Sequence, residues 1–323
     1  MTIEATDALT LPAGAEPALD LRVDLGRALV LPNPIGVASG TFGYGFEFAH
    51  LIDIHRLGCI WTKGTTLHPR AGNAPPRVAE TAGGMLNSIG LQNPGVEHVA
   101  ASYAARFAAW RVPVVVNVAA GDVAEYVAVV RRLEGVAGVA GIELNISCPN
   151  IAHGLDFGRE PAAAARVVEA VRAATSLSLT VKLSPNVTDI AAVAAAVESA
   201  GADAVSAVNT YVGMKVHLGI RGPVLPRGTG GLSGPAIKPL ALAAVAAVRA
   251  AVRIPVVGVG GIRSAEDALE FFVAGAAAVQ VGTASFADPG AALAVLDGVV
   301  AYARREGLQR LTELRWSPPP AGD

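Results

Sequence analysis

The chain has only two cysteines among its 323 residues, Cys59 and Cys148, and they lie far apart. Two such thiols build neither a disulfide framework nor a set of metal ligands, and the six histidines show no metal-binding spacing. We therefore expect no bound metal and a reducing, cytoplasmic location. Charged residues are also scarce, at 16 %, and a net charge of −2 provides no basic field for nucleic acid.

Long apolar runs are missing as well. No segment has the length and apolar character of a membrane span, and residues 1–20 lack the basic and apolar regions of a signal peptide. We expect residues 1–20 to be a flexible arm and residues 311–323, which include a proline triplet, to be a C-terminal tail. The apolar fraction, by contrast, is 52 %, which is enough for one large core.

Short β-branched runs alternate with alanine-rich segments of helical length. The predicted strands are Ile35–Ala38, Cys59–Thr62, Val112–Val118, Gly141–Ile146, Leu177–Leu183, Ala204–Val208, Pro255–Val259 and Ala277–Val281. The predicted helices are Val123–Leu133, Pro161–Thr175, Thr188–Ala200, Pro239–Ala251 and Ala265–Ala274, the last capped by Ser264. Eight strands with helical crossovers predict one α/β domain over residues 21–310, a closed (β/α)8 TIM barrel. An open, doubly wound sheet is the alternative.

Two segments interrupt this alternation. Residues 68–94 are rich in Gly, Pro and Asn, and residues 211–235 contain seven glycines. Long excursions in a compact domain usually serve function. If the barrel is right, both segments follow strands, and we expect them to lie as long loops over its C-terminal mouth.

The segment Ile142–Asn150 combines a buried strand with chemically active side chains. An apolar run ends in Asn145, and Cys148 and Asn150 follow in the next loop, where a β/α barrel places its chemistry. A thiol among neutral hydrogen-bonding groups indicates acid–base or nucleophilic work on a small polar substrate, and the alternative is an inert buried thiol. Cys59 begins a strand and is predicted to belong to the core.

Polar residues and glycines recur just beyond the other predicted strands. Gly260-Gly261 and Gly282-Thr283 offer bare backbone near two helix starts, which suits a phosphate group, although such loops are often only tight turns. Lys63 and Lys182 either contact an anion or an electron-rich ring or extend along the barrel rim into solvent.

Four asparagines at the predicted mouth suit a ligand with alternating C=O and N–H groups, such as a pyrimidine-like ring. They are Asn87, Asn145, Asn150 and Asn209. Taken singly, each could be a turn former.

As a set, these segments resemble the class 1 dihydroorotate dehydrogenases. The matching motifs are Asn87–Gly95, Asn145–Asn150, Lys182–Ile190, Val208–Thr210, Gly231–Pro239 and Gly258–Ile262. They run in the family's order over roughly residues 34–287. The resemblance implies a β/α barrel that binds FMN and oxidises (S)-dihydroorotate to orotate in pyrimidine synthesis.

The resemblance also assigns roles to individual residues. Cys148 would be the general base that removes the C5 proton. The residues expected to bind the substrate are Lys63, Asn87, Ser88, Ile89, Gly90, Leu91, Asn145, Asn150, Asn209 and Thr210. The residues expected to bind FMN are Ser39, Gly40, Lys63, Gly64, Asn117, Asn145, Lys182, Val208, Gly234, Gly260, Gly261, Gly282 and Thr283.

Within the family, the closest resemblance is to class 1B, the FMN-binding catalytic subunit of an NAD-dependent enzyme. Members of this class pair with a subunit that carries FAD and a 2Fe-2S cluster. The present chain has too few cysteines for a cluster of its own. The resemblance implies a homodimer within a heterotetramer. The alternatives are the FMN domain of a dihydropyrimidine dehydrogenase, acting on uracil or thymine, and a flavin-free barrel that binds a phosphorylated metabolite.

Overall fold

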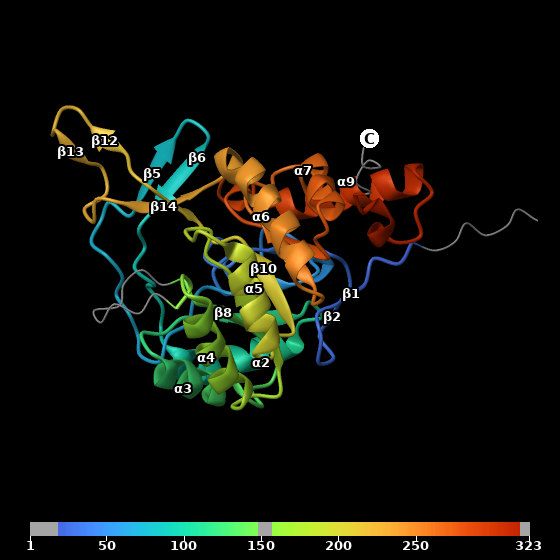
Figure 1. Cartoon of the computed structure of the whole chain (residues 1–323), viewed down its shortest axis with the longest axis horizontal. Helices are drawn as coiled ribbons and strands as arrows, with labels where there is room; N and C mark the ends of the chain where they lie inside the picture. The colour runs from blue at the N-terminus through green and yellow to red at the C-terminus, as the bar shows by residue number, and fades with distance from the viewer. Residues whose placement is uncertain (1–18, 148–156, 317–323) are drawn as a thin grey trace, which may run out of the picture.

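Eight parallel strands close into a barrel in the computed structural model, which describes residues 19–147 and 157–316. Neighbouring strands pair in the order β10-β15-β16-β3-β4-β7-β8-β9 (Figure 1). Their bounds are β3 Ile35–Val37, β4 Ile60–Trp61, β7 Val114–Val118, β8 Val139–Asn145, β9 Ser178–Lys182, β10 Ala204–Ala207, β15 Val256–Val259 and β16 Ala278–Val281. The closed order confirms the predicted barrel and excludes the open sheet.

Helices surround the barrel and bury one apolar face each. Those between the strands are α3 Val123–Leu133, α4 Pro161–Arg172, α5 Ile190–Ser199, α6 Lys238–Ala251 and α7 Ala265–Val273. These are the five predicted helices, with ends shifted by a few residues. Ser264 does cap α7, in a capping box with Asp267. None of the helices in the described ranges is long and apolar enough to cross a membrane.

The remaining helical segments were not expected from the sequence. They are η1 Ile54–Arg56, α1 Val96–His98, the π-helical turn η2 Val99–Tyr103, α2 Ala104–Ala109, η3 Pro235–Ile237, α8 Ala284–Ala287, α9 Ala291–Arg305 and η4 Leu311–Leu314. Of these, α9 follows the eighth strand and packs against α7 and β3, which completes the ring of helices.

A short N-terminal hairpin closes the amino-terminal end of the barrel. Its strands are β1 Val23–Asp24 and β2 Val30–Leu31. Leu25, Leu29 and Leu31 are buried in one cluster with inward-facing strand residues that include Cys59 and Trp61. Cys59 is therefore a core residue, as predicted. Because the hairpin closes the amino-terminal end, a ligand can reach the barrel interior from the carboxyl end.

A four-stranded antiparallel sheet lies over that carboxyl end. Its strands, in the order β11-β14-β6-β5, are β11 Tyr211–Gly213, β14 Gly230–Ser233, β6 Gly84–Asn87 and β5 Val78–Thr81. The two long excursions thus pair with each other, and Gly231 lies opposite Asn87. This sheet was not expected, because each segment resembles an irregular loop on its own.

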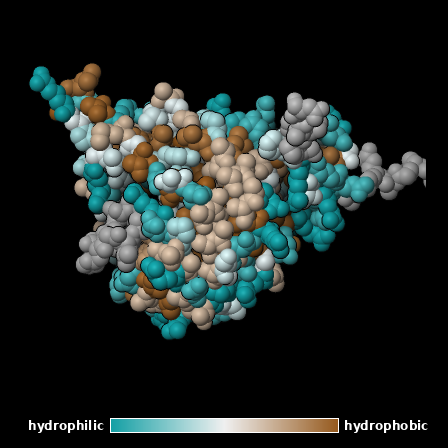
Figure 2. Space-filling model, viewed as in Figure 1, coloured by the Kyte–Doolittle hydropathy of each residue, from teal (hydrophilic) through white to brown (hydrophobic). Residues whose placement is uncertain are grey.

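A second hairpin projects from this sheet. It consists of β12 Val216–His217 and β13 Gly222–Pro223 and stands clear of the barrel (Figure 1). Leu218 and Ile220 between its strands are 87 % and 69 % exposed, and Figure 2 shows hydrophobic residues beside hydrophilic ones at the projecting tip. An apolar tip of this kind is typical of a surface that meets another chain.

Candidate active site

A cavity of about 570 Å³ lies between the carboxyl ends of the barrel strands and the four-stranded sheet. This volume lies within the usual range for cofactor and substrate sites. Every predicted site residue within the described ranges lines it: Ser39, Gly40, Lys63, Gly64, Asn87, Ser88, Ile89, Gly90, Leu91, Asn117, Asn145, Lys182, Val208, Asn209, Thr210, Gly234, Gly260, Gly261, Gly282 and Thr283. Cys148 and Asn150 lie outside the described residues. The structure thus gathers the set, and the role of each member stays a prediction.

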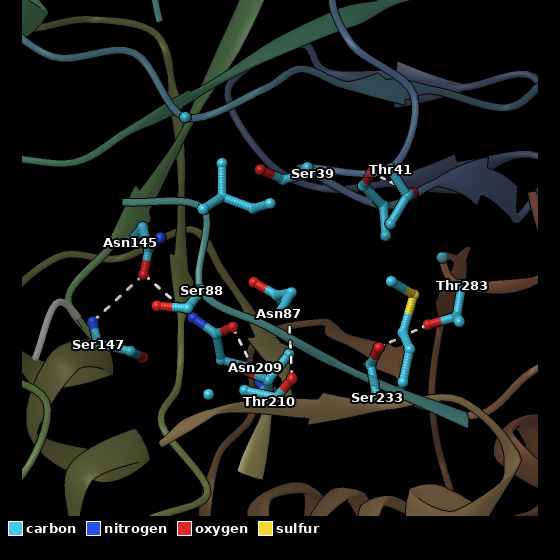
Figure 3. A pocket seen from close by; sticks show the side chains of 18 of the residues that line it. Ser39, Thr41, Asn87, Ser88, Asn145, Ser147, Asn209, Thr210, Ser233 and Thr283 are labelled. Atoms are coloured by element: carbon cyan, nitrogen blue, oxygen red, sulfur yellow. Dashed lines mark hydrogen bonds between the residues drawn. The ribbon is translucent and has the colours of Figure 1, made fainter. Parts of the chain in front are cut away.

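One end of the cavity is a cluster of amide side chains. The side-chain oxygen of Asn145, at the end of β8, accepts a hydrogen bond from Asn209 Nδ2 over 3.1 Å and one from the backbone N–H of Ser147 over 3.3 Å (Figure 3). Asn209 Oδ1 accepts in turn from the backbone N–H of Thr210 over 2.8 Å. Tyr126 from α3 anchors the strand end by donating its hydroxyl proton to the backbone oxygen of Asn145.

The sheet over the mouth contributes a third amide. Asn87, at the end of β6, donates from Nδ2 to the backbone oxygen of Gly231 in β14 over 3.2 Å. This bond joins the two long segments, residues 68–94 and 211–235, and fixes the position of the Asn87 side chain. Asn73 supports the adjoining loop, because its Nδ2 donates over 3.0 Å both to the backbone oxygen and to Oγ of Ser88. Arg227 reaches Asn73 Oδ1 over 3.2 Å and also lines the cavity. Sequence reasoning missed Asn73 and Arg227, because only the tertiary fold brings them to the site.

Two lysines direct positive charge into the cavity. Lys182 ends β9 and is only 5 % exposed, which excludes a solvent-facing rim position for it. Burial lowers the pKa of Lys63, and the nearby charge of Glu47 opposes that shift. Neither ammonium group makes a hydrogen bond or ion pair with another residue in the described part of the chain. Two such cations suit an anionic or electron-rich ligand.

Glycine backbone lines the opposite end of the cavity. Gly234, Gly260 and Gly261 all have positive φ angles, of 99°, 138° and 75°. A Cβ atom on Gly261 would stand 2.8 Å from Lys238 Cβ, so no larger residue fits there without movement. Thr283 donates its hydroxyl proton to Ser233 Oγ over 2.8 Å beside these glycines (Figure 3). Close backbone approach and hydroxyl donors suit a phosphate group.

A buried carboxylate lies below the cavity, and sequence reasoning missed it. Glu143 in β8 has no exposed surface and accepts hydrogen bonds from Asn117, Ser206 and Gln280. Its position in the sequence could have revealed it, because a carboxylate in the middle of an apolar strand is buried and needs hydrogen-bond donors around it. Asn117 joins this network to the cavity that it lines.

The fold and the site together define a β/α-barrel enzyme with glycine backbone, two lysines and an amide cluster in one cavity at the carboxyl end of the barrel. A sequence model described as dihydroorotate dehydrogenase matches residues 26–302. The chain therefore belongs to the dihydroorotate dehydrogenase family.

Curated relatives refine this assignment. The chain is 50 % identical over 293 residues to a protein of Porphyromonas gingivalis (90 % of this chain, 95 % of the relative). It is also 50 % identical over 296 residues to one of Pelobacter propionicus (91 % and 97 %), and 48 % identical over 297 residues to one of Desulforamulus reducens (92 % and 97 %). All three are named dihydroorotate dehydrogenase B (NAD⁺), catalytic subunit. The predicted family and its class 1B branch are confirmed, and the dihydropyrimidine dehydrogenase alternative is disfavoured.

Proposed function

We propose that this chain oxidises (S)-dihydroorotate to orotate in de novo pyrimidine synthesis, with FMN as its cofactor. One observation carries the proposal. In a chain from this family, one cavity brings together an amide cluster, a glycine-lined end and two lysines whose ammonium groups have no bonding partner among the described residues. The amides suit the ring of a pyrimidine, the lysines suit its carboxylate and an electron-rich flavin, and the glycines suit a phosphate group.

The residues present fit FMN. The phosphate end of FMN would be held by Gly234, Gly260, Gly261, Gly282 and Thr283. At Gly260 or Gly261 an added Cβ atom would collide with α6, so the backbone there can lie close to a ligand only because these residues are glycines. The ring would lie among Ser39, Gly40, Lys63, Gly64, Asn117, Asn145, Lys182 and Val208. Asn117 Oδ1 is buried and has no hydrogen-bond partner among the described residues, and a ring N–H group would supply the donor that this acceptor needs.

The substrate would lie against the ring, held from three elements of the fold. Asn145, Asn209 and Thr210 come from the barrel, and Asn87 comes from the sheet above it. With Asn150 they would pair with the C=O and N–H groups of the pyrimidine ring. Lys63 and the backbone of Ser88, Ile89, Gly90 and Leu91 would bind the carboxylate.

Oxidation of the C5–C6 bond needs a base at one carbon and a hydride acceptor at the other. When bound, FMN supplies the acceptor for the C6 hydride. Cys148 would remove the C5 proton, since it follows the amide-bearing end of β8 by three positions. An unperturbed thiol has a pKa of about 8.5, so Cys148 as base predicts activity that rises toward alkaline pH.

Substrate choice tests this function directly. The FMN-loaded chain should oxidise dihydroorotate in the presence of an artificial electron acceptor and should act poorly on dihydrouracil, which lacks the carboxylate. Cys148→Ser should retain FMN and orotate binding, lower kcat and move the pH profile upward, because a hydroxyl is a weaker acid than a thiol. Equal activity on both substrates would favour the dihydropyrimidine dehydrogenase function instead.

We further propose a cytoplasmic assembly in which a partner subunit carries FAD and a 2Fe-2S cluster and passes electrons to NAD⁺. The relatives are named catalytic subunits, and the apolar tip at Leu218 and Ile220 supports an assembled state, a homodimer within a heterotetramer. The isolated chain should then consume about one equivalent of dihydroorotate per flavin and fail to reduce NAD⁺. Rapid NAD⁺ reduction without a partner, or a monomer in sedimentation with the partner present, would contradict the proposal.

A further inference from the structure

Glu143 joins three strands in the centre of the barrel. Its Oε1 accepts from Ser206 Oγ in β10 and from Gln280 Nε2 in β16, each over 2.8 Å, and its Oε2 accepts from Asn117 Nδ2 in β7 over 2.7 Å. All four side chains are fully buried. A buried carboxylate requires such donors, and bonds of this kind are stronger than those between neutral groups.

The bond to Glu143 fixes which way the Asn117 amide points. A carboxylate oxygen accepts, so the NH2 group of Asn117 must face Glu143 and the carbonyl oxygen must face away. That oxygen is buried without a hydrogen-bond partner among the described residues. It lies 3.2 Å from the place where a Cβ atom on Gly64 would stand, and both Asn117 and Gly64 line the cavity. The barrel therefore presents a fixed acceptor at this point.

We propose that Glu143 is a positioning residue for the cofactor: it holds Asn117 so that an acceptor, and not a donor, meets the ring of the bound flavin. The inference rests on the proposed FMN function. The pyrimidine part of an oxidised flavin ring carries one N–H group between two carbonyls, so an amide that turned over would present its own N–H groups against ring carbonyls or leave the ring N–H unpaired. Glu143 does not touch the ligand and acts through Asn117.

A polarity swap between the two residues tests this role. Asn117→Asp alone places a second carboxylate against Glu143, and the two repel each other. In Asn117→Asp combined with Glu143→Gln, the new Gln amide donates to the new Asp, while its oxygen still accepts from Ser206 and Gln280. The other Asp oxygen still faces the cavity as an acceptor. The double variant also has the same net charge as the wild type.

The readouts are the Kd for FMN, from quenching of flavin fluorescence, and the Tm of the apoprotein. We expect Asn117→Asp to weaken FMN binding about tenfold or more and the swap to restore the Kd to within about threefold of wild type. If Asn117→Asp does not fold, Glu143→Gln takes its place, because its new amide N–H group faces the N–H group of Asn117 and turns that amide over; we expect the same loss of FMN affinity, restored in the swap. A swap that does not fold, or that folds with a Kd still raised about tenfold, overturns it.

A purely structural role for Glu143 gives a different result. The Tm of the apoprotein would then fall in Asn117→Asp and recover in the swap, while the Kd for FMN stayed within about threefold of wild type in every folded variant; this pattern overturns the inference. A wild-type chain that fails to bind FMN contradicts the proposed function itself, and the two failures are therefore distinguishable.

Discussion

Asn209 donates a hydrogen bond from Nδ2 to Oδ1 of Asn145 over 3.1 Å, which joins the end of β8 to the segment that follows β10. Both residues also line the cavity. Each amide therefore orients the other before a ligand arrives, so their contributions to binding are coupled.

This coupling predicts a non-additive double mutant. Asn145→Ala and Asn209→Ala should each weaken orotate binding by about tenfold, and the double variant should lose less than the product of the two, because either deletion already frees the other amide. Titration of orotate against the FMN-loaded proteins measures the Kd values. Asn33→Ala is the matched control, since it removes an amide that bonds Arg56 and Ile35 away from the cavity and should leave Kd unchanged. Strictly multiplicative losses would contradict the coupling.

The lowered pKa of Lys63 predicts a pH-dependent affinity for the carboxylate ligand. Burial disfavours the charged ammonium, and a bound carboxylate favours it. Orotate affinity should therefore fall as pH rises through the lowered pKa, below the ordinary lysine value of 10.5. Lys63→Arg should keep its affinity over that range, because a guanidinium stays charged. Lys63→Met should bind weakly at every pH, and a Met variant with the wild-type pH profile would exclude Lys63 as the titrating group.

Gly261 should tolerate no side chain. Its φ of 75° and the 2.8 Å approach of a new Cβ to Lys238 Cβ predict that Gly261→Ala loses about 1–3 kcal/mol of stability and most of its FMN affinity. Gly307→Ala is the control, because Gly307 has a similar φ of 66° with no atom within 4 Å of a new Cβ. It should lose about 1 kcal/mol and no FMN affinity. Equal FMN Kd values for the two variants would show that Gly261 does not shape the phosphate end.

The ion pair between Lys238 and Asp267, at 2.7 Å, predicts an acid-sensitive contribution to stability. Burial raises the pKa of Asp267, but hydrogen bonds from Lys238, Arg263 and Ser264 outweigh it and lower the pKa below 3.8. Since the folded value lies below the unfolded one, the contribution is present above about pH 3.8 and is lost as pH falls through the folded value.

Lys238→Met should therefore lower the Tm near neutral pH, by the equivalent of about 1–3 kcal/mol. The difference from wild type should shrink in acid. Arg132→Met, which removes an exposed ion pair with Glu97, should change the Tm little at either pH. A Tm difference for Lys238→Met that does not depend on pH would contradict the linkage.

The barrel could be predicted from the sequence because its signals are local. The apolar runs, the helical periodicity of Val123–Leu133 and the Ser264 cap are each visible within about ten residues. The sheet over the mouth could not be predicted, because its key pair, Gly231 and Asn87, is brought together only by the tertiary fold. Glycine-rich strands also carry little alternation to detect.

The same distinction applies to the candidate site. The residues Asn145 and Lys182 and the glycines that directly follow β15 and β16 stand at strand ends, where a barrel places its chemistry. Their grouping therefore followed from the predicted fold. Glu143 was missed because its importance depends on Ser206 and Gln280, which reach it from across the barrel. Long-range hydrogen-bond partners of this kind have no signature in a single sequence.

Anaerobic mixing of the FMN-loaded chain with dihydroorotate tests the central claim most directly, with the flavin absorbance recorded against time. We expect rapid bleaching in wild type, slow bleaching in Cys148→Ser, and fast bleaching that requires more substrate in Asn209→Ala. A flavin-bound chain that dihydroorotate does not bleach would contradict the proposed oxidation of dihydroorotate by FMN.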